Sequence, residues 1–153
     1  MATVFSIQKN QWGVNSPSEK TKTNEMAGRV RVAYGEYEAA SLASADVIEM
    51  FNLPNNARIV GAKLGHDALG GSTTLSVGYA AHTNSAGTAV SAAAAAYKAA
   101  AASTAAQVVD ACATLALGFA SETDADYTGV PVTVTMGGTG TGTITLTMLY
   151  VTD

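Results

Sequence analysis

The sequence predicts an all-β protein: a single antiparallel β-sandwich that is jelly-roll-like. Three observations support this fold class. Short segments from Arg29 onward alternate apolar and polar residues, turn-forming Pro, Asn and Gly residues separate them, and 153 residues suffice for one hydrophobic core but not for two. Two sheets that are each apolar on one face bury those faces by packing together as a sandwich.

The first half of this region contains four expected strands. In the first, Val30, Val32 and Tyr34 share one face, and the second covers residues 46–53. A Pro-Asn-Asn turn at residues 54–56 follows, because Pro fixes one backbone dihedral and Asn tolerates left-handed conformations. The third strand is expected around residues 60–64, and the fourth, after a Gly-Gly turn, around residues 74–79.

The C-terminal segment carries the clearest alternation in the chain. Val, Val, Val and Met occupy every second position of residues 130–136, and Ile, Leu, Met and Tyr do so over residues 144–150. This pattern predicts two strands paired as a hairpin, joined by the glycine-rich residues 137–142. Phosphate-binding glycines open a helix, whereas these lie between two strands, so the segment is interpreted as a turn.

The Ala-rich middle, residues 86–117, leaves two structures open. Ala favours helix intrinsically, which suggests a helix, or else an Ala-rich excursion, inserted before one further strand. A membrane-spanning helix is not expected, because Lys98 interrupts the run and the run is shorter than the roughly 20 residues a span requires. We therefore expect no membrane association.

The polar N-terminal segment, residues 1–28, shows no sustained period and is predicted to be an arm that precedes a sandwich domain at residues 29–153. Such an arm is either a tether that binds a neighbouring subunit or a frayed terminus. Trp12 favours the tether, because large aromatic side chains are enriched in binding hot spots. Trp12 is therefore the predicted partner-binding residue.

The charge content restricts the classes of partner. Only 13% of residues are charged, against roughly 25% in ordinary domains, and the formal net charge is −4. A surface with so few Lys and Arg residues is unsuited to a phosphate backbone, so no nucleic acid is expected. An uncharged surface favours assembly with other subunits. A single cysteine and no visible secretory signal indicate synthesis in a reducing cytoplasm.

Candidate chemical sites are weak. His66, His82 and Cys112 lack the spacing of a metal site, and Cys112 is expected to be a small core residue. The acidic residues Glu122, Asp124 and Asp126 fit a solvated loop or, at most, a weak calcium site. No paired carboxylates or nucleophile motif suggest catalysis. We expect no enzyme activity, no catalytic residues and no cofactor.

Three segments resemble small virion structural proteins of tailed bacteriophages. They are VRVAYGEYEAASLASADVIEMFNLPNNARIVGAKL at residues 30–64, STTLSVGY at residues 72–79, and TGTITLTMLYVTD at residues 141–153. The resemblance implies a capsid decoration or cement protein on the outer surface of the virion capsid. Its expected partners are the major capsid protein and its own copies in a homotrimer, and it carries over no named binding residues.

Other functions remain open at the level of sequence. A tail, connector or fibre-base component shares the same traits, since β-sandwiches serve in all of these positions. A receptor- or glycan-binding module is a further alternative, for which exposed tyrosines supply stacking surfaces. The candidates are Tyr34, Tyr37, Tyr79 and Tyr97.

Overall fold

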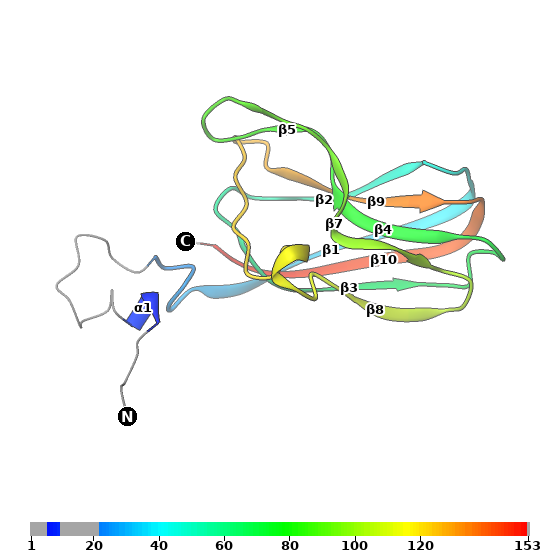
Figure 1. Ribbon diagram of the computed structural model, residues 1–153, viewed down its shortest axis with the longest axis horizontal. Helices are drawn as coiled ribbons and strands as arrows, with labels where there is room; N and C mark the ends of the chain where they lie inside the picture. Colours follow the sequence, from blue (N-terminus) through cyan, green and yellow to red (C-terminus); the bar gives the residue numbers. More distant parts are fainter. Residues whose placement is uncertain (1–5, 10–21, 153) are drawn as a thin grey trace.

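The computed structural model describes residues 6–9 and 22–152, and this part of the chain is dominated by β-strands (Figure 1). Helical structure in it is limited to α1 (Ile7–Lys9) and the 3-10 helix η2 (Leu115–Leu117). No helix in the described ranges is long and apolar enough to cross a membrane.

The described chain forms ten strands. They are, in order, β1 (Arg29–Leu42), β2 (Val47–Leu53), β3 (Arg58–His66), β4 (Thr74–Tyr79), β5 (His82–Thr83), β6 (Ala89–Val90), β7 (Ala93–Ala102), β8 (Gln107–Ala111), β9 (Val130–Gly137) and β10 (Gly140–Thr152). The strands expected at residues 46–53, 60–64 and 74–79 are confirmed as β2, β3 and β4.

Eight of these strands form two four-stranded antiparallel sheets. The first sheet has the order β1-β10-β3-β8 and the second has the order β2-β9-β4-β7, while β5 and β6 form a separate small hairpin. The two sheets face each other across one apolar core (Figure 1). The predicted all-β sandwich is therefore confirmed.

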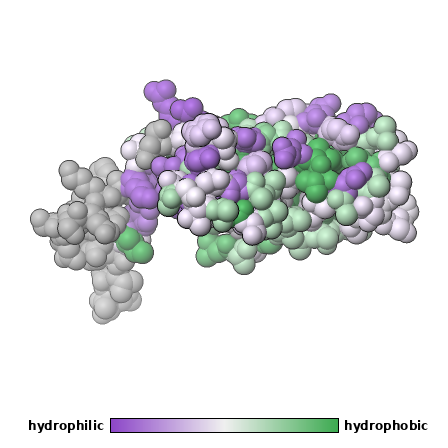
Figure 2. Space-filling view, turned by 90° about the horizontal axis from the view of Figure 1, so that it is seen from above, coloured by the Kyte–Doolittle hydropathy of each residue, from purple (hydrophilic) through white to green (hydrophobic). Residues whose placement is uncertain are grey.

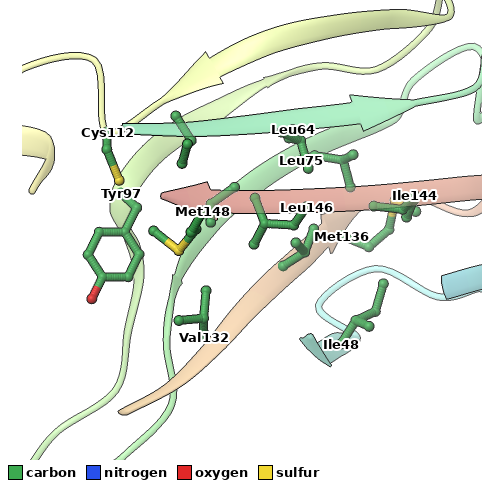
Figure 3. Packing of buried hydrophobic residues seen from close by; sticks show 14 of the residues in the cluster. Ile48, Leu64, Leu75, Tyr97, Cys112, Val132, Met136, Ile144, Leu146 and Met148 are labelled. Atoms are coloured by element: carbon green, nitrogen blue, oxygen red, sulfur yellow. The ribbon is translucent and has the colours of Figure 1, made fainter. Parts of the chain in front are cut away.

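The core lies between the two sheets, and the central strands β10 and β9 each contribute fully buried side chains to it. Leu146 and Met148 point inward from β10 and Val132 and Val134 from β9, and all four are fully buried. Figure 3 shows Leu146, Met148 and Val132 directed into the same region. Removal of each aliphatic side chain of this size from water stabilises the fold by about 1.5–3 kcal/mol. The alternation along β9 and β10 therefore largely determines which faces of the two sheets pack together.

The predicted hairpin between residues 130–136 and 144–150 is wrong. Both segments are strands, but β9 pairs with β2 and β4, whereas β10 pairs with β1 and β3. The glycine-rich connection carries the chain from one sheet to the other. Alternation specifies which face of a strand is buried, not which strand it pairs with, and both apolar faces reach the same core from opposite sides.

Of the two structures left open for the Ala-rich middle, the helix is wrong, because the Ala-rich run forms the edge strand β7, paired with β4, while the further strand expected after it is present as β8. The intrinsic preference of Ala for helix over other residues is below about 0.7 kcal/mol per position. The backbone pairing of β7 with β4 outweighs that preference, as does the burial of Tyr97. Tyr97 extends from β7 into the core and is only 6% exposed. Tertiary packing thus overrides local propensity.

Cys112 is buried after β8, as predicted for a small core residue, and its backbone N–H donates to the carbonyl of Tyr97 at 2.7 Å. Burial raises the pKa of its thiol from 9.0 to about 12. Desolvation acts in the same direction on the pKa of the Tyr97 phenol. Both groups therefore favour the protonated form when the protein is folded.

We expect alkaline pH to destabilise the protein. As pH rises above 9 the unfolded thiol ionises while the folded thiol does not, so the free energy of unfolding falls until about pH 12. Thermal unfolding across this range measures the effect. Cys112→Ala should reduce the dependence of the free energy of unfolding on pH to the part that is due to Tyr97. Identical slopes in the two proteins would contradict this assignment.

Candidate assembly interface

The outer face of the sheet β1-β10-β3-β8 carries exposed apolar side chains. Val30 and Val32 of β1 are each 61% exposed, and Leu149 of β10 is 39% exposed. Val32 lies directly opposite Leu149, and Tyr34 lies opposite Thr147 on the same face. The predicted shared face of residues 30, 32 and 34 is thus present, but it faces away from the core.

The rest of this outer face is mixed. Lys63 of β3 and Asp110 of β8 lie opposite each other and form an ion pair, and the hollow of about 390 Å³ beside them is lined in part by Phe119 and Leu149. Farther along β1, Glu36 and Glu38 are exposed on the same face and form no ion pair with any residue that the structure describes. An acidic and partly apolar face is suited to a protein surface rather than to a polyanion.

Charged residues are sparse elsewhere too. Figure 2 shows hydrophilic residues scattered among weakly hydrophobic ones on the face seen from above, with a group of strongly hydrophobic residues between them. This view agrees with the low charge content of the sequence. The face in this view therefore mixes hydrophilic and hydrophobic residues.

An ion-pair network attaches the end of the predicted arm to the sandwich. Arg58 of β3 contacts Glu25 at 3.4 Å and Glu122 at 3.1 Å, and Lys22 contacts Glu122 at 3.1 Å. Asn24 is buried and donates from Nδ2 to a backbone carbonyl of the β2–β3 turn at 3.1 Å. Residues 22–28 are thereby held at one end of the sandwich, which fixes the point from which the preceding chain extends.

Sequence reasoning missed this network. Arg58 belongs to a turn sequence and Glu122 to an acidic run, and 64 residues separate them. An isolated β-bridge between the two residues brings them together. Only the tertiary fold supplies that proximity, so no local pattern was available to predict it.

The predicted site residues are distributed as follows. Trp12, the predicted partner-binding residue, lies outside the described residues. Tyr34 and Tyr37 are exposed on β1, while Tyr79 and Tyr97 lie together, with ring centroids 5.9 Å apart.

His82 lies close to the acidic run and lines one hollow with Asp124, whereas His66 lies elsewhere, beside Asp67 and Gln107. Within the described ranges, no three His, Cys, Asp or Glu side chains form a group that could hold a metal ion. Hydrogen bonds from Ser85 and Thr128 hold the pKa values of Asp124 and Asp126, respectively, below 3.8. These two carboxylates stabilise loops.

The fold and the outer face define a class: a small two-sheet antiparallel β-sandwich with exposed apolar side chains on one outer face. No family model and no curated protein matches the chain. Solved structures do match. A chain from the capsid of Ralstonia phage GP4 is 26% identical, has a TM-score of 0.66, and the match covers 88% of this chain and 92% of that one.

A chain from the capsid asymmetric unit of cyanophage Pam1 is also similar. Its TM-score is 0.63 with 18% identity, and the match covers 100% of both chains. At that identity the likeness concerns the fold alone. Both neighbours come from phage capsids, so the resemblance to phage virion structural proteins noted in the sequence is confirmed.

Proposed function

We propose that this chain is a structural protein of a bacteriophage virion, specifically a decoration or cement protein that binds the outside of the major capsid shell and stabilises it. The observation that carries the proposal is the match to a chain of the Ralstonia phage GP4 capsid, which extends over nearly the full length of both chains. A similarity of that extent involves the whole sandwich and not one shared motif.

The strand order supports assigning the sandwich to the jelly-roll class. Eight strands lie in two sheets, and every connection between consecutive strands of the sandwich crosses to the other sheet, except the one from β4 to β7. Double-sheet jelly rolls of eight strands occur in viral capsid domains. The topology is thus compatible with a structural role in a capsid.

Decoration is favoured over a tail, connector or fibre-base position by the surface. Only 13% of the residues are charged, and so sparsely charged a surface favours contact with a protein shell. Bridging adjacent shell subunits adds buried area that opposes expansion of the shell. Its location would then be the capsid surface.

Co-sedimentation with undecorated capsids tests this function. We expect the purified protein to pellet with shells that lack it, to saturate, and to raise the temperature at which those shells release their DNA. Tail preparations from the same phage provide the control. Binding to tails but not to shells would contradict decoration and favour the tail alternative.

We further propose a closed homotrimer in which the apolar part of the face around Val32 contacts a second copy, since assembly removes its exposed side chains from water. Val32→Glu should lower the mass measured by light scattering toward that of the monomer. Val47→Glu is the matched control, because Val47 is 56% exposed on β2 of the opposite sheet. Equal masses for the two variants, on the free protein and on assembled particles, would contradict this interface.

Trp12 remains the proposed capsid-binding residue of the arm. Trp12→Ala should weaken shell binding by about 2 kcal/mol, as truncation of an aromatic hot spot does, while the thermal unfolding midpoint stays nearly constant. A co-sedimentation titration beside a melting curve measures both. Unchanged affinity would remove the tether interpretation, and a large drop in the midpoint would place Trp12 in the domain's own core.

A further inference from the structure

A second feature lies at one end of the sandwich, apart from the outer face. A pocket of about 380 Å³ opens between β4, β7, the β5–β6 hairpin and the loop that follows η2. Its lining includes the side chains of Tyr79, His82, Tyr97 and Asp124. The volume falls within the range of small-molecule sites, about 300–1,000 Å³.

Three rings form one wall of this pocket. The centroids of Tyr79 and Tyr97 are 5.9 Å apart with their planes inclined at 58°, and Tyr79 meets His82 edge-on at 5.4 Å. Tyr79 and His82 are only partly buried, so their rings offer accessible surface. Clustered aromatic rings of this kind provide flat apolar surfaces beside polar groups.

The Tyr97 hydroxyl is a polar group that the pocket presents to a ligand. The side chain is only 6% exposed and its hydroxyl makes no hydrogen bond to any residue that the structure describes, but the oxygen is not fully buried, so solvent reaches it. Figure 3 shows the hydroxyl directed away from the aliphatic core residues. In the free protein the hydroxyl therefore bonds to water, which a ligand hydroxyl can replace.

The position of this ring is determined by its neighbours. Gly118, with a φ of 81°, lies so close that a Cβ there would stand 2.7 Å from Cδ1 of Tyr97. A side chain at position 118 would therefore displace the ring. The ring of Tyr97 is thereby fixed, with its hydroxyl at the pocket.

The mouth of the pocket supplies hydrogen-bond acceptors. One Asp124 oxygen, Oδ1, accepts from the Ser85 backbone at 3.0 Å and from its hydroxyl at 2.6 Å, while Oδ2 has no bond within the described part of the chain. His82 Nδ1 lies 3.1 Å from the carbonyl of Ala80, which places the ring hydrogen on Nδ1 and leaves Nε2 as an acceptor.

We propose that this pocket binds a neutral carbohydrate and holds a single pyranose ring. The flat rings of Tyr79 and His82 suit the apolar C–H face of a sugar ring. The Tyr97 hydroxyl, Asp124 Oδ2 and His82 Nε2 suit its hydroxyl groups, and the carboxylate at the mouth disfavours acidic sugars. This binding activity is separate from attachment to the capsid and does not depend on it.

Ligand-observed saturation-transfer NMR on the full chain tests the site. The probes are methyl β-galactopyranoside, methyl α-mannopyranoside and N-acetylglucosamine, with glucuronate as the anionic comparison. We expect at least one neutral sugar to bind with a millimolar Kd and glucuronate to bind more weakly. Absence of binding by all three neutral sugars would overturn the proposal and leave the Tyr97 hydroxyl paired with water only.

Two variants locate the binding. Tyr97→Phe removes one hydroxyl and keeps the ring, so affinity should fall roughly threefold to tenfold. Tyr79→Ala removes the stacking surface and should reduce affinity more than tenfold. Tyr127→Ala, at a tyrosine that is 98% exposed and does not line the pocket, is the matched control and should bind as the natural protein does. Affinity that is unchanged in Tyr97→Phe, or lost equally in Tyr127→Ala, would overturn the assignment.

Discussion

Leu146→Ala is expected to lower the free energy of unfolding by about 2–5 kcal/mol, one of the two largest effects in this protein. Leu146 is fully buried at the centre of β10, within a core to which both sheets contribute. Removing its branched end leaves a cavity that the strand ladders on both sides of β10 prevent from closing. Denaturant unfolding measures the loss.

Leu149→Ala is the matched control on the same strand. Leu149 lies on the outer face and is 39% exposed, so its truncation should cost less than about 1 kcal/mol. The pair separates core packing from surface effects with the same chemical change. Equal losses for the two variants would contradict the assignment of the inner and outer faces of β10.

Gly78→Ala is the second substitution with a large expected effect, a loss of about 3 kcal/mol. A Cβ at position 78 would stand 1.9 Å from the carbonyl oxygen of Ala93 and 2.6 Å from the carbonyl carbon of Ala94. Pairing between β4 and β7 is irregular at this point. Because the obstacle is backbone, β7 must move, and the Tyr97 ring that it carries moves with it.

Gly61→Ala is the control for a strand glycine without such contacts. A Cβ at position 61 would meet nothing within 4 Å, and its backbone conformation does not require glycine. We expect stability within about 1 kcal/mol of the natural protein, in the stabilising direction. If Gly78→Ala unfolds at the same denaturant concentration as Gly61→Ala, the close approach of β4 and β7 is incorrect.

The sequence predicted the strands more reliably than their pairing. Alternation identified β2, β3, β4, β9 and β10, because burial of one face leaves a period of two in the residues themselves. It did not reveal that β9 and β10 belong to different sheets, because pairing depends on contacts far apart in sequence. For the Ala-rich strand β7, local propensity indicated the wrong structure.

The candidate sites were less predictable for the same reason. Tyr79 and Tyr97 were both noted as tyrosines that could stack on a ligand. Their convergence with His82 depends on the irregular pairing of β7 with β4, where β7 passes close to Gly78. Similarly, the outward direction of Val30 and Val32 follows from the register of β1 on β10 and not from their alternation. The residue types indicated which side chains could bind a ligand or a partner, but not how the fold places them relative to one another.

The central claim is that the chain decorates a capsid shell, and copy number in purified virions tests it most directly. Quantitative gel densitometry compares the band of this protein with that of the major shell protein in the same particles. Decoration predicts hundreds of copies in a fixed ratio to a distinct shell protein. A handful of copies per particle, or particles whose shell consists of this chain alone, would contradict it.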